Sequence, residues 1–114
     1  MKLYRQLEYY LKDVLLNNDS NKLPYHNLNH TLCVLKNCYY LSLEYTIDPD
    51  DKRLLCIAAL YHDFGHSGGL FTDDWNVKAA IEHFENISKE NPEDTSLVMQ
   101  IIKASFLFLF SFLI

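Results

Sequence analysis

Apolar side chains recur at intervals of three and four residues along most of the chain, the spacing that aligns them on one face of a helix. The first such stripe, within residues 2–17, consists of Leu3, Leu7, Tyr10, Leu11, Val14 and Leu15. No alternation typical of a strand runs for a convincing length before the last eleven residues. The pattern therefore predicts an all-α fold, a bundle of four to five helices joined by short connections.

Polar breaks and capping residues divide this pattern into segments. The polar run at 17–21 and Pro24 end the first helix. Asp48 followed by Pro49 is typical of an N-cap and the first residue of a helix, and Gly65 is expected to end that helix. We expect helices over about residues 2–17, 27–45, 49–65 and 74–90, with a fifth starting near 92 or 93.

The final segment, Ala104–Ile114, carries no charge and consists mainly of Phe and Leu. As a helix it would extend ~16 Å, short of the ~30 Å hydrocarbon core of a bilayer. A longer stretch beginning at Leu97 would include Gln100 and Lys103. We expect residues 1–103 to form the helical domain. The apolar tail is then a buried last helix, a membrane tail, or the place where a longer domain stops early.

Charge and cysteine content exclude some classes of function. The chain has 10 Lys and Arg against 15 Asp and Glu, which gives a net charge of −5. An acidic surface repels phosphate backbones, so a nucleic-acid duplex is not an expected partner. The three cysteines have no CxxC spacing, so neither a disulfide framework nor a cysteine zinc site is predicted. A reducing, cytoplasmic location fits this usage.

Four of the five histidines lie in two short clusters with a spacing of four residues. The pairs are His26 with His30 and His62 with His66. This spacing would put both rings of a pair on one helix face. Imidazoles and carboxylates ligate divalent transition metals, and Asp63 directly follows His62. Two such pairs indicate a metal site, although histidines at this spacing also arise by chance. His83 stands alone and is interpreted as a surface or rim residue.

In full, the clusters are Tyr25-His26-Asn27-x-x-His30 and His62-Asp63-x-x-His66-x-Gly68. These motifs resemble those of the HD-domain metal-dependent phosphohydrolases. Their spelling is most similar to that of the class I cyclic-nucleotide phosphodiesterases and of small HD-domain proteins from bacteria and phages. The resemblance extends over about residues 24–84. It implies an HD-domain-like helical fold within residues 1–103 and hydrolysis of a phosphate ester or phosphodiester in a small, nucleotide-like substrate.

The resemblance also implies roles for individual residues. His30, His62 and Asp63 would ligate the first of two divalent cations, with Asp63 bridging to the second. The ligand types permit Mn²⁺, Mg²⁺, Zn²⁺ or Fe. His26 would be the general acid that protonates the leaving oxygen, a task suited to imidazole near neutral pH.

Supporting roles are implied for Asn27, which would orient the first cluster, and for His66, which would support the second metal's water shell or the substrate phosphate. The family pattern includes a further Asp ligand on a later helix, and this sequence has no Asp after Asp94. Asp73 and Asp74 are candidates to replace it, although helix capping explains them equally well. We therefore expect a truncated or frameshifted domain. Two functions stay open: an active phosphohydrolase, or an impaired metal-binding remnant or binding module.

Overall fold

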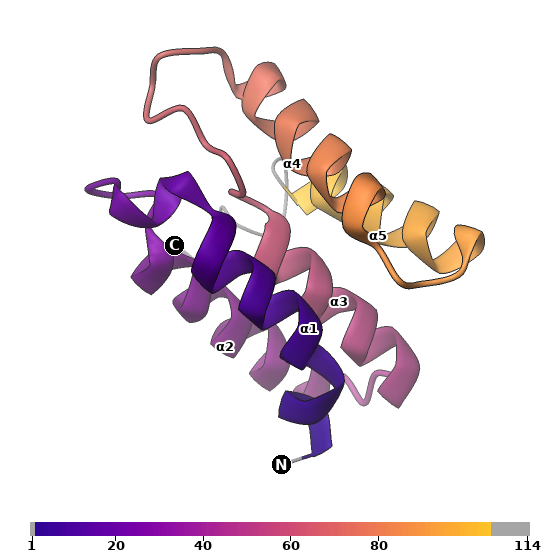
Figure 1. Ribbon diagram of the computed structural model, residues 1–114. Coiled ribbons are helices and arrows are strands. Elements are labelled where there is room, and N and C mark those ends of the chain that lie inside the picture. The colour runs from indigo at the N-terminus through magenta and orange to yellow at the C-terminus, as the bar shows by residue number, and fades with distance from the viewer. Residues whose placement is uncertain (1, 106–114) are drawn as a thin grey trace.

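The computed structural model describes residues 2–105, which form an all-helical bundle (Figure 1). Its elements are α1 (Lys2–Asn17), the short 3₁₀ helix η1 (Asp19–Lys22), α2 (Leu28–Glu44), α3 (Pro49–Tyr61), α4 (Asp73–Ile87) and α5 (Pro92–Ser105). No strand occurs among the described residues, and the predicted all-α bundle of four to five helices is confirmed, with five α-helices in residues 2–105. The apolar tail predicted at 104–114 falls, beyond Ser105, outside the described residues.

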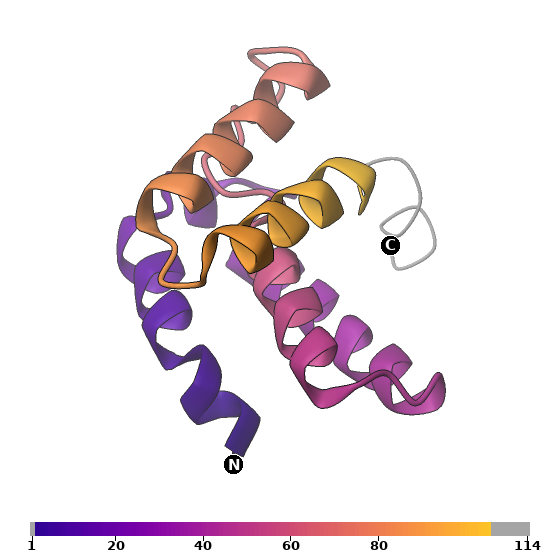
Figure 2. The same ribbon diagram turned by 90° about the vertical axis from the view of Figure 1, so that its right-hand side faces the viewer.

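Helix α3 is the central element of the bundle. Every residue from Cys56 to Tyr61 is at most 1% exposed. A helix that is apolar on all sides is stable only where other elements cover it all round. Accordingly, α3 packs against α1, α2, α4 and α5. Figure 1 shows α1 and α2 lying alongside α3, and Figure 2 shows α4 and α5 joined by a short turn into an open V. The residues that follow α3 therefore leave the helix inside the molecule.

The main core lies where α1, α3, α4 and α5 meet. At its centre three aromatic rings contact one another, those of Tyr10, Tyr61 and Phe84, with centroids 5.4 to 5.9 Å apart. This is the range in which aromatic pairs attract. Around them pack the buried residues Leu7, Val14, Leu54, Ile57, Ala80, Val98 and Ile102. This core fixes the end of α3 relative to three other helices.

Glu90, in the turn between α4 and α5, makes polar contacts with residues of α1 and α3. The Arg53 guanidinium lies 2.7 Å from Glu90 Oε1, and the Tyr10 hydroxyl donates to Glu90 Oε2 at 2.5 Å. The Glu90 side chain is 12% exposed. Burial by itself raises the pKa of this carboxyl, but the hydrogen bonds from Arg53 and Tyr10 outweigh burial and hold the pKa below its ordinary value.

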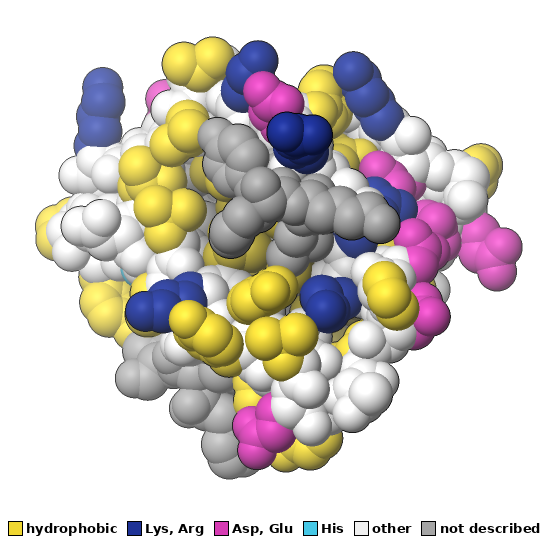
Figure 3. All heavy atoms as spheres, turned by 90° about the horizontal axis from the view of Figure 1, so that it is seen from below, with side chains coloured by type: hydrophobic (Ala, Val, Ile, Leu, Met, Phe, Trp, Pro, Cys, Tyr) yellow, Lys and Arg dark blue, Asp and Glu magenta, His cyan; other side chains and the backbone are white. Residues whose placement is uncertain are grey.

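The surface carries apolar side chains scattered among charged ones. Figure 3 shows this on the face seen from below, where hydrophobic, basic and acidic side chains are interspersed. Single exposed apolar residues are normal on globular proteins. Among the helices described, none combines the length and the apolar character that a bilayer-spanning segment requires.

Phe84→Ala is expected to lower the free energy of unfolding by about 3–5 kcal/mol, because it removes a fully buried ring and leaves a cavity. Leu16→Ala is the matched control, since Leu16 is 80% exposed, and it should change stability by less than about 0.5 kcal/mol. Urea denaturation measures both values. A loss for Phe84→Ala no larger than that for Leu16→Ala would contradict the core described above.

Acid is expected to destabilise the protein partly through Glu90. Because the folded-state pKa of Glu90 lies below its ordinary value of 4.5, its ionised form stabilises the fold above that pH. This contribution is lost as the pH falls from 4.5 through the folded-state pKa. Glu90→Gln should therefore flatten the decline of unfolding free energy below pH 4.5. The exposed Glu82→Gln, which removes a surface pair with Lys78, should follow the wild-type curve. Parallel acid curves for wild type and Glu90→Gln would refute this assignment.

Candidate metal centre

The two histidine clusters meet at the C-terminal end of α3. Helix α3 ends at Tyr61, so His62 and Asp63 stand at the beginning of the turn that follows it. The prediction that this helix continues to Gly65 is wrong. The turn is closed by two backbone hydrogen bonds, from Phe64 N–H to the Tyr61 carbonyl and from the residue 66 N–H to the Asp63 carbonyl. Gly65 allows the chain to turn, since its φ of +72° lies in the left-handed region.

The prediction that each histidine pair shares one helix face is also wrong. His26 lies before α2, and His30 lies in its first turn. His62 and His66 both lie beyond the last residue of α3. The rings of His26 and His30 are nevertheless neighbours, with centroids 5.7 Å apart. The turns on either side of the helix ends, not helical periodicity, bring these side chains together.

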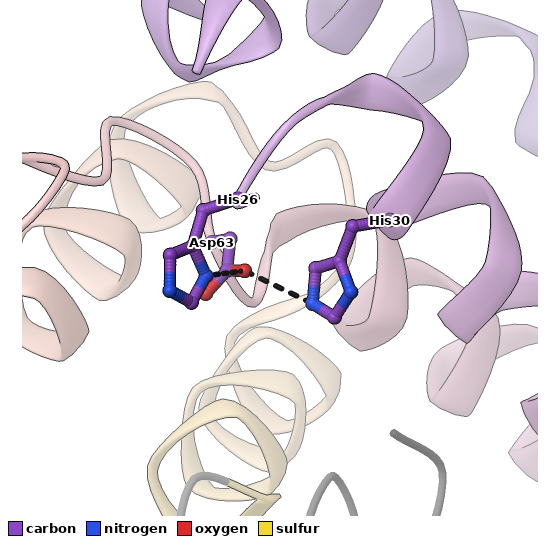
Figure 4. A group of neighbouring side chains, drawn as sticks. All are labelled: His26, His30 and Asp63. Atoms are coloured by element: carbon purple, nitrogen blue, oxygen red, sulfur yellow. Dashed lines mark hydrogen bonds and ion pairs between the residues drawn. The ribbon is translucent and has the colours of Figure 1, made fainter. Parts of the chain in front are cut away.

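Asp63 is the residue on which the clusters converge (Figure 4). Its Oδ2 atom is 2.7 Å from His26 Nδ1 and 3.2 Å from His30 Nε2. These three side chains offer ligand atoms that all lie within 4.8 Å of one another, a group that could hold a metal ion. The Asp63 side chain is 13% exposed, so its charge interacts with these rings with little screening by water.

His62 adds a further nitrogen to the same place. Its Nδ1 lies 2.6 Å from the Ala59 carbonyl oxygen, which accepts a hydrogen bond and so assigns the proton to Nδ1. Nε2 is then the ring nitrogen with the lone pair in the neutral imidazole. This atom is 3.2 Å from His30 Nε2 and 3.2 Å from Asp63 Oδ2.

His30 Nε2, His62 Nε2 and Asp63 Oδ2 thus form a triangle with three equal sides of 3.2 Å. Bonds of ~2.1 Å to a divalent cation put neighbouring ligand atoms ~3.0 Å apart in octahedral and ~3.4 Å apart in tetrahedral coordination. The triangle lies between these values. Two imidazoles and one carboxylate are also a donor set that Zn²⁺, Mn²⁺ and Fe²⁺ accept. These residues therefore fit a divalent cation in both spacing and chemistry.

The electrostatics of the cluster favour the ionisation states that a cation needs. Burial acts to raise the pKa of the Asp63 carboxyl, but the hydrogen bonds and positive charge that His62 and His26 supply in their protonated forms outweigh it and hold the pKa well below its usual range. Burial, together with the neighbouring His62, lowers the pKa of His30. At neutral pH the site therefore contains an ionised carboxylate beside a neutral His30 ring.

His66 lies at the edge of the cluster and is held by α4. Its ring stacks on that of His26, with centroids 3.7 Å apart and an interplanar angle of 14°. Asn76 is 6% exposed, its Nδ2 is 3.3 Å from His66 Nε2, and its Oδ1 accepts from Ser67 N–H at 2.9 Å. The sequence analysis missed Asn76. A signal was present, because Asn76 shares a stripe of helical spacing with two buried apolar residues, Ala80 and Phe84.

The remaining candidates lie nearby, outside the group of possible ligands in residues 2–105. Asn27 is the N-cap of α2, and its side chain accepts from the His30 N–H at 3.0 Å, which orients the first cluster through the backbone. Thr72 caps α4, and Asp73 and Asp74 stand exposed in its first turn. Acidic residues are favourable at that position because of the helix dipole.

His83 is more firmly held than a surface residue. Its Nε2 lies 2.8 Å from Asp13 Oδ2, and its ring stacks on Phe64 with centroids 3.7 Å apart. The Tyr61 hydroxyl donates to the same Asp13 oxygen at 2.7 Å. This network connects α1, α3 and α4 on the side of Phe64, and it packs against the residue that follows Asp63.

Comparison with known proteins agrees with the two motifs. Residues 25–102 match the family described as 3'5'-cyclic nucleotide phosphodiesterase. No curated protein and no solved structure matches the chain. The matched region runs from the start of the first motif to the end of the buried part of α5 and contains every candidate ligand. Because it spans more than half of the sequence, the chain belongs to the 3'5'-cyclic nucleotide phosphodiesterase family.

Proposed function

We propose that this chain hydrolyses a phosphodiester or phosphate ester in a small nucleotide, with divalent cations held by His30, His62 and Asp63. The observation that carries the proposal is the 3.2 Å triangle formed by their ligand atoms. A 3',5'-cyclic nucleotide is the first substrate to test, because the family is defined by that substrate class.

The carboxylate and the two imidazoles contribute differently to the proposed site. Asp63 supplies the negative charge that attracts a cation into a partly buried site. His30 and His62 each offer Nε2, and the bond from His62 Nδ1 to the Ala59 carbonyl keeps that ring in the ligating tautomer. When bound, a divalent cation supplies positive charge that holds a phosphate and makes a water molecule easier to deprotonate.

His26 is the proposed general acid. Asp63 Oδ2 accepts the hydrogen on His26 Nδ1, at 2.7 Å, so Nε2 is the ring atom that can carry a second proton to the leaving oxygen. After the transfer the ring is neutral and keeps its bond to Asp63. The stack on His66 fixes the plane of the His26 ring and therefore the direction in which Nε2 points.

A second candidate function is that of a metal-binding module without turnover. It is favoured by one observation: the possible ligand group in residues 2–105 contains a single carboxylate, that of Asp63. One carboxylate with imidazoles can hold one cation, whereas the mechanism implied by the resemblance employs two. The stoichiometry of bound metal and the presence of hydrolysis distinguish the two functions.

Mn²⁺ is expected to bind wild-type protein and to raise its thermal midpoint, because a ligand that binds the folded state alone stabilises it. His62→Ala and Asp63→Ala should each weaken binding beyond the ~10–100-fold that loss of an outer partner costs. His83→Gln, a histidine change outside the ligand group, should retain wild-type affinity. Isothermal titration calorimetry gives affinity and stoichiometry. Equal affinity in wild type and Asp63→Ala would refute the proposed ligands.

Wild-type protein with Mn²⁺ is expected to hydrolyse a 3',5'-cyclic nucleotide or an aryl phosphodiester, and His26→Ala should lower kcat by about 10²–10⁴-fold while metal stays bound. Product release measured at saturating metal checks both points. Metal binding in the complete absence of turnover would favour the second candidate function. Unchanged kcat in His26→Ala would remove His26 from its proposed role.

A further inference from the structure

The turn that carries Asp63 is short and held in an unusual backbone conformation. It includes Gly65 at φ +72°, in the left-handed region, and Gly68 in the loop that follows has a similar φ of +67°. A Cβ added at Gly65 would meet no atom within 4 Å, so the requirement for glycine there comes from the backbone and not from crowding. Two hydrogen bonds inside the turn do not by themselves fix the direction of the Asp63 side chain.

Two buried polar side chains from the segment between α1 and α2 hydrogen-bond to the backbone of this turn. Asn18 Oδ1 accepts from the Gly65 N–H at 3.0 Å. The Ser20 hydroxyl is within donating distance of the Asp63 carbonyl oxygen, at 3.2 Å, and of Asn18 Oδ1, at 2.9 Å. Asn18 is 5% and Ser20 1% exposed. The two peptide groups on either side of Phe64, which contain the Asp63 carbonyl and the Gly65 N–H, are thus bonded to residues more than forty positions earlier in the chain.

The segment that carries Asn18 and Ser20 is in turn hydrogen-bonded to α1. Asn18 Nδ2 donates to Asn21 Oδ1 at 3.2 Å, and Asn21 Nδ2 donates to the Val14 carbonyl at 2.9 Å. Val14 is a core residue of α1, 1% exposed. The segment also packs against the loop that follows the turn, since a Cβ on Gly68 would come within 2.9 Å of the Leu23 side chain. These contacts therefore fix the position of the Asp63 turn relative to the core residues of α1.

We infer that Asn18 and Ser20 are positioning residues, which set the direction of the Asp63 carboxylate toward the cation through the backbone of its turn. The bond from Ser20 to the Asp63 carbonyl restrains rotation about Cα–C of residue 63, and that rotation sets where Cβ points relative to the turn. The inference rests on the proposed function, because it assigns a purpose to the orientation of a proposed ligand. Partners beyond the ligands tune metal sites in this way.

Ser42 provides a matched control for Ser20. It is also 1% exposed, and its hydroxyl also donates to a backbone carbonyl, that of Tyr39, at 2.6 Å. Ser42 lies near the C-terminal end of α2, whereas His30 lies in the first turn of that helix. Ser20→Ala and Ser42→Ala therefore remove the same kind of buried bond, but only one of them touches the turn of Asp63.

The test compares Mn²⁺ affinity, by calorimetry, with the stability of metal-free protein, by urea denaturation, in the full chain. We expect Ser20→Ala to weaken Mn²⁺ binding by ~10–100-fold and Ser42→Ala to leave it within about twofold of wild type. Both variants should lose metal-free stability to a similar degree. The visible spectrum of bound Co²⁺ should change in Ser20→Ala and match wild type in Ser42→Ala, which a purely structural role of Ser20 does not predict.

If Ser20→Ala does not fold, Ser20→Cys keeps an atom at the γ position, although a larger one, weakens the donor, and should lower Mn²⁺ affinity in the same direction. Wild-type affinity and Co²⁺ spectrum in the Ser20 variant would overturn the inference and leave the proposed function standing. Failure of wild-type protein to bind Mn²⁺ would overturn the proposed function, and this inference with it.

Discussion

The burial of α3 forces a charged residue into the interior, and much of the molecule is arranged around that residue. The last six residues of the helix are almost completely inaccessible, so the chain emerges from it beneath the surface. Asp63 follows two residues after the end of the helix, with a side chain that is 13% exposed. An ionised carboxylate in such a place needs partners within hydrogen-bond distance. The first turn of α2 and the segment before it provide these partners in His30 and His26.

Three separate parts of the chain converge on the turn after α3, and each contacts a different part of it. Residues before and within α2 contact the Asp63 carboxylate. Asn18 and Ser20, in the segment after α1, hold the backbone of the turn, and Asn76 in α4 holds the loop at His66. Because these supports come from α4 and from segments that adjoin α1 and α2, and these helices pack with α3, the geometry of the cluster depends on the packing of the bundle. A site on rigid elements keeps its ligands oriented before a cation arrives.

The sequence predicted the helices and the family well, because both leave local signals. Apolar periodicity marks helices, and the combination of His30 with His62-Asp63 marks a family. It failed at the ends of two helices and where the determining contact is distant. The helix-face model of the histidine pairs was wrong, because Asn27 starts α2 after His26 and α3 ends at Tyr61. The polar run at 17–21 resembles a linker, and no local pattern shows that it hydrogen-bonds to a turn 43 to 47 positions later.

The molecule contains a second histidine–aspartate contact, and the difference between the two supports ligation at Asp63. At Asp13, each contact joins one hydrogen-bonding group to a carboxylate oxygen. Asn17 donates to Oδ1, and the Tyr61 hydroxyl and His83 Nε2 are both within hydrogen-bond distance of Oδ2. At Asp63, by contrast, three imidazole nitrogens crowd one oxygen. Two of those nitrogens also face each other at 3.2 Å, although one ring directs its proton away to the Ala59 carbonyl. A shared proton satisfies one such contact at a time, whereas a cation accepts lone pairs from several donors at once, so the spacing at Asp63 is the one that the proposed cation would require.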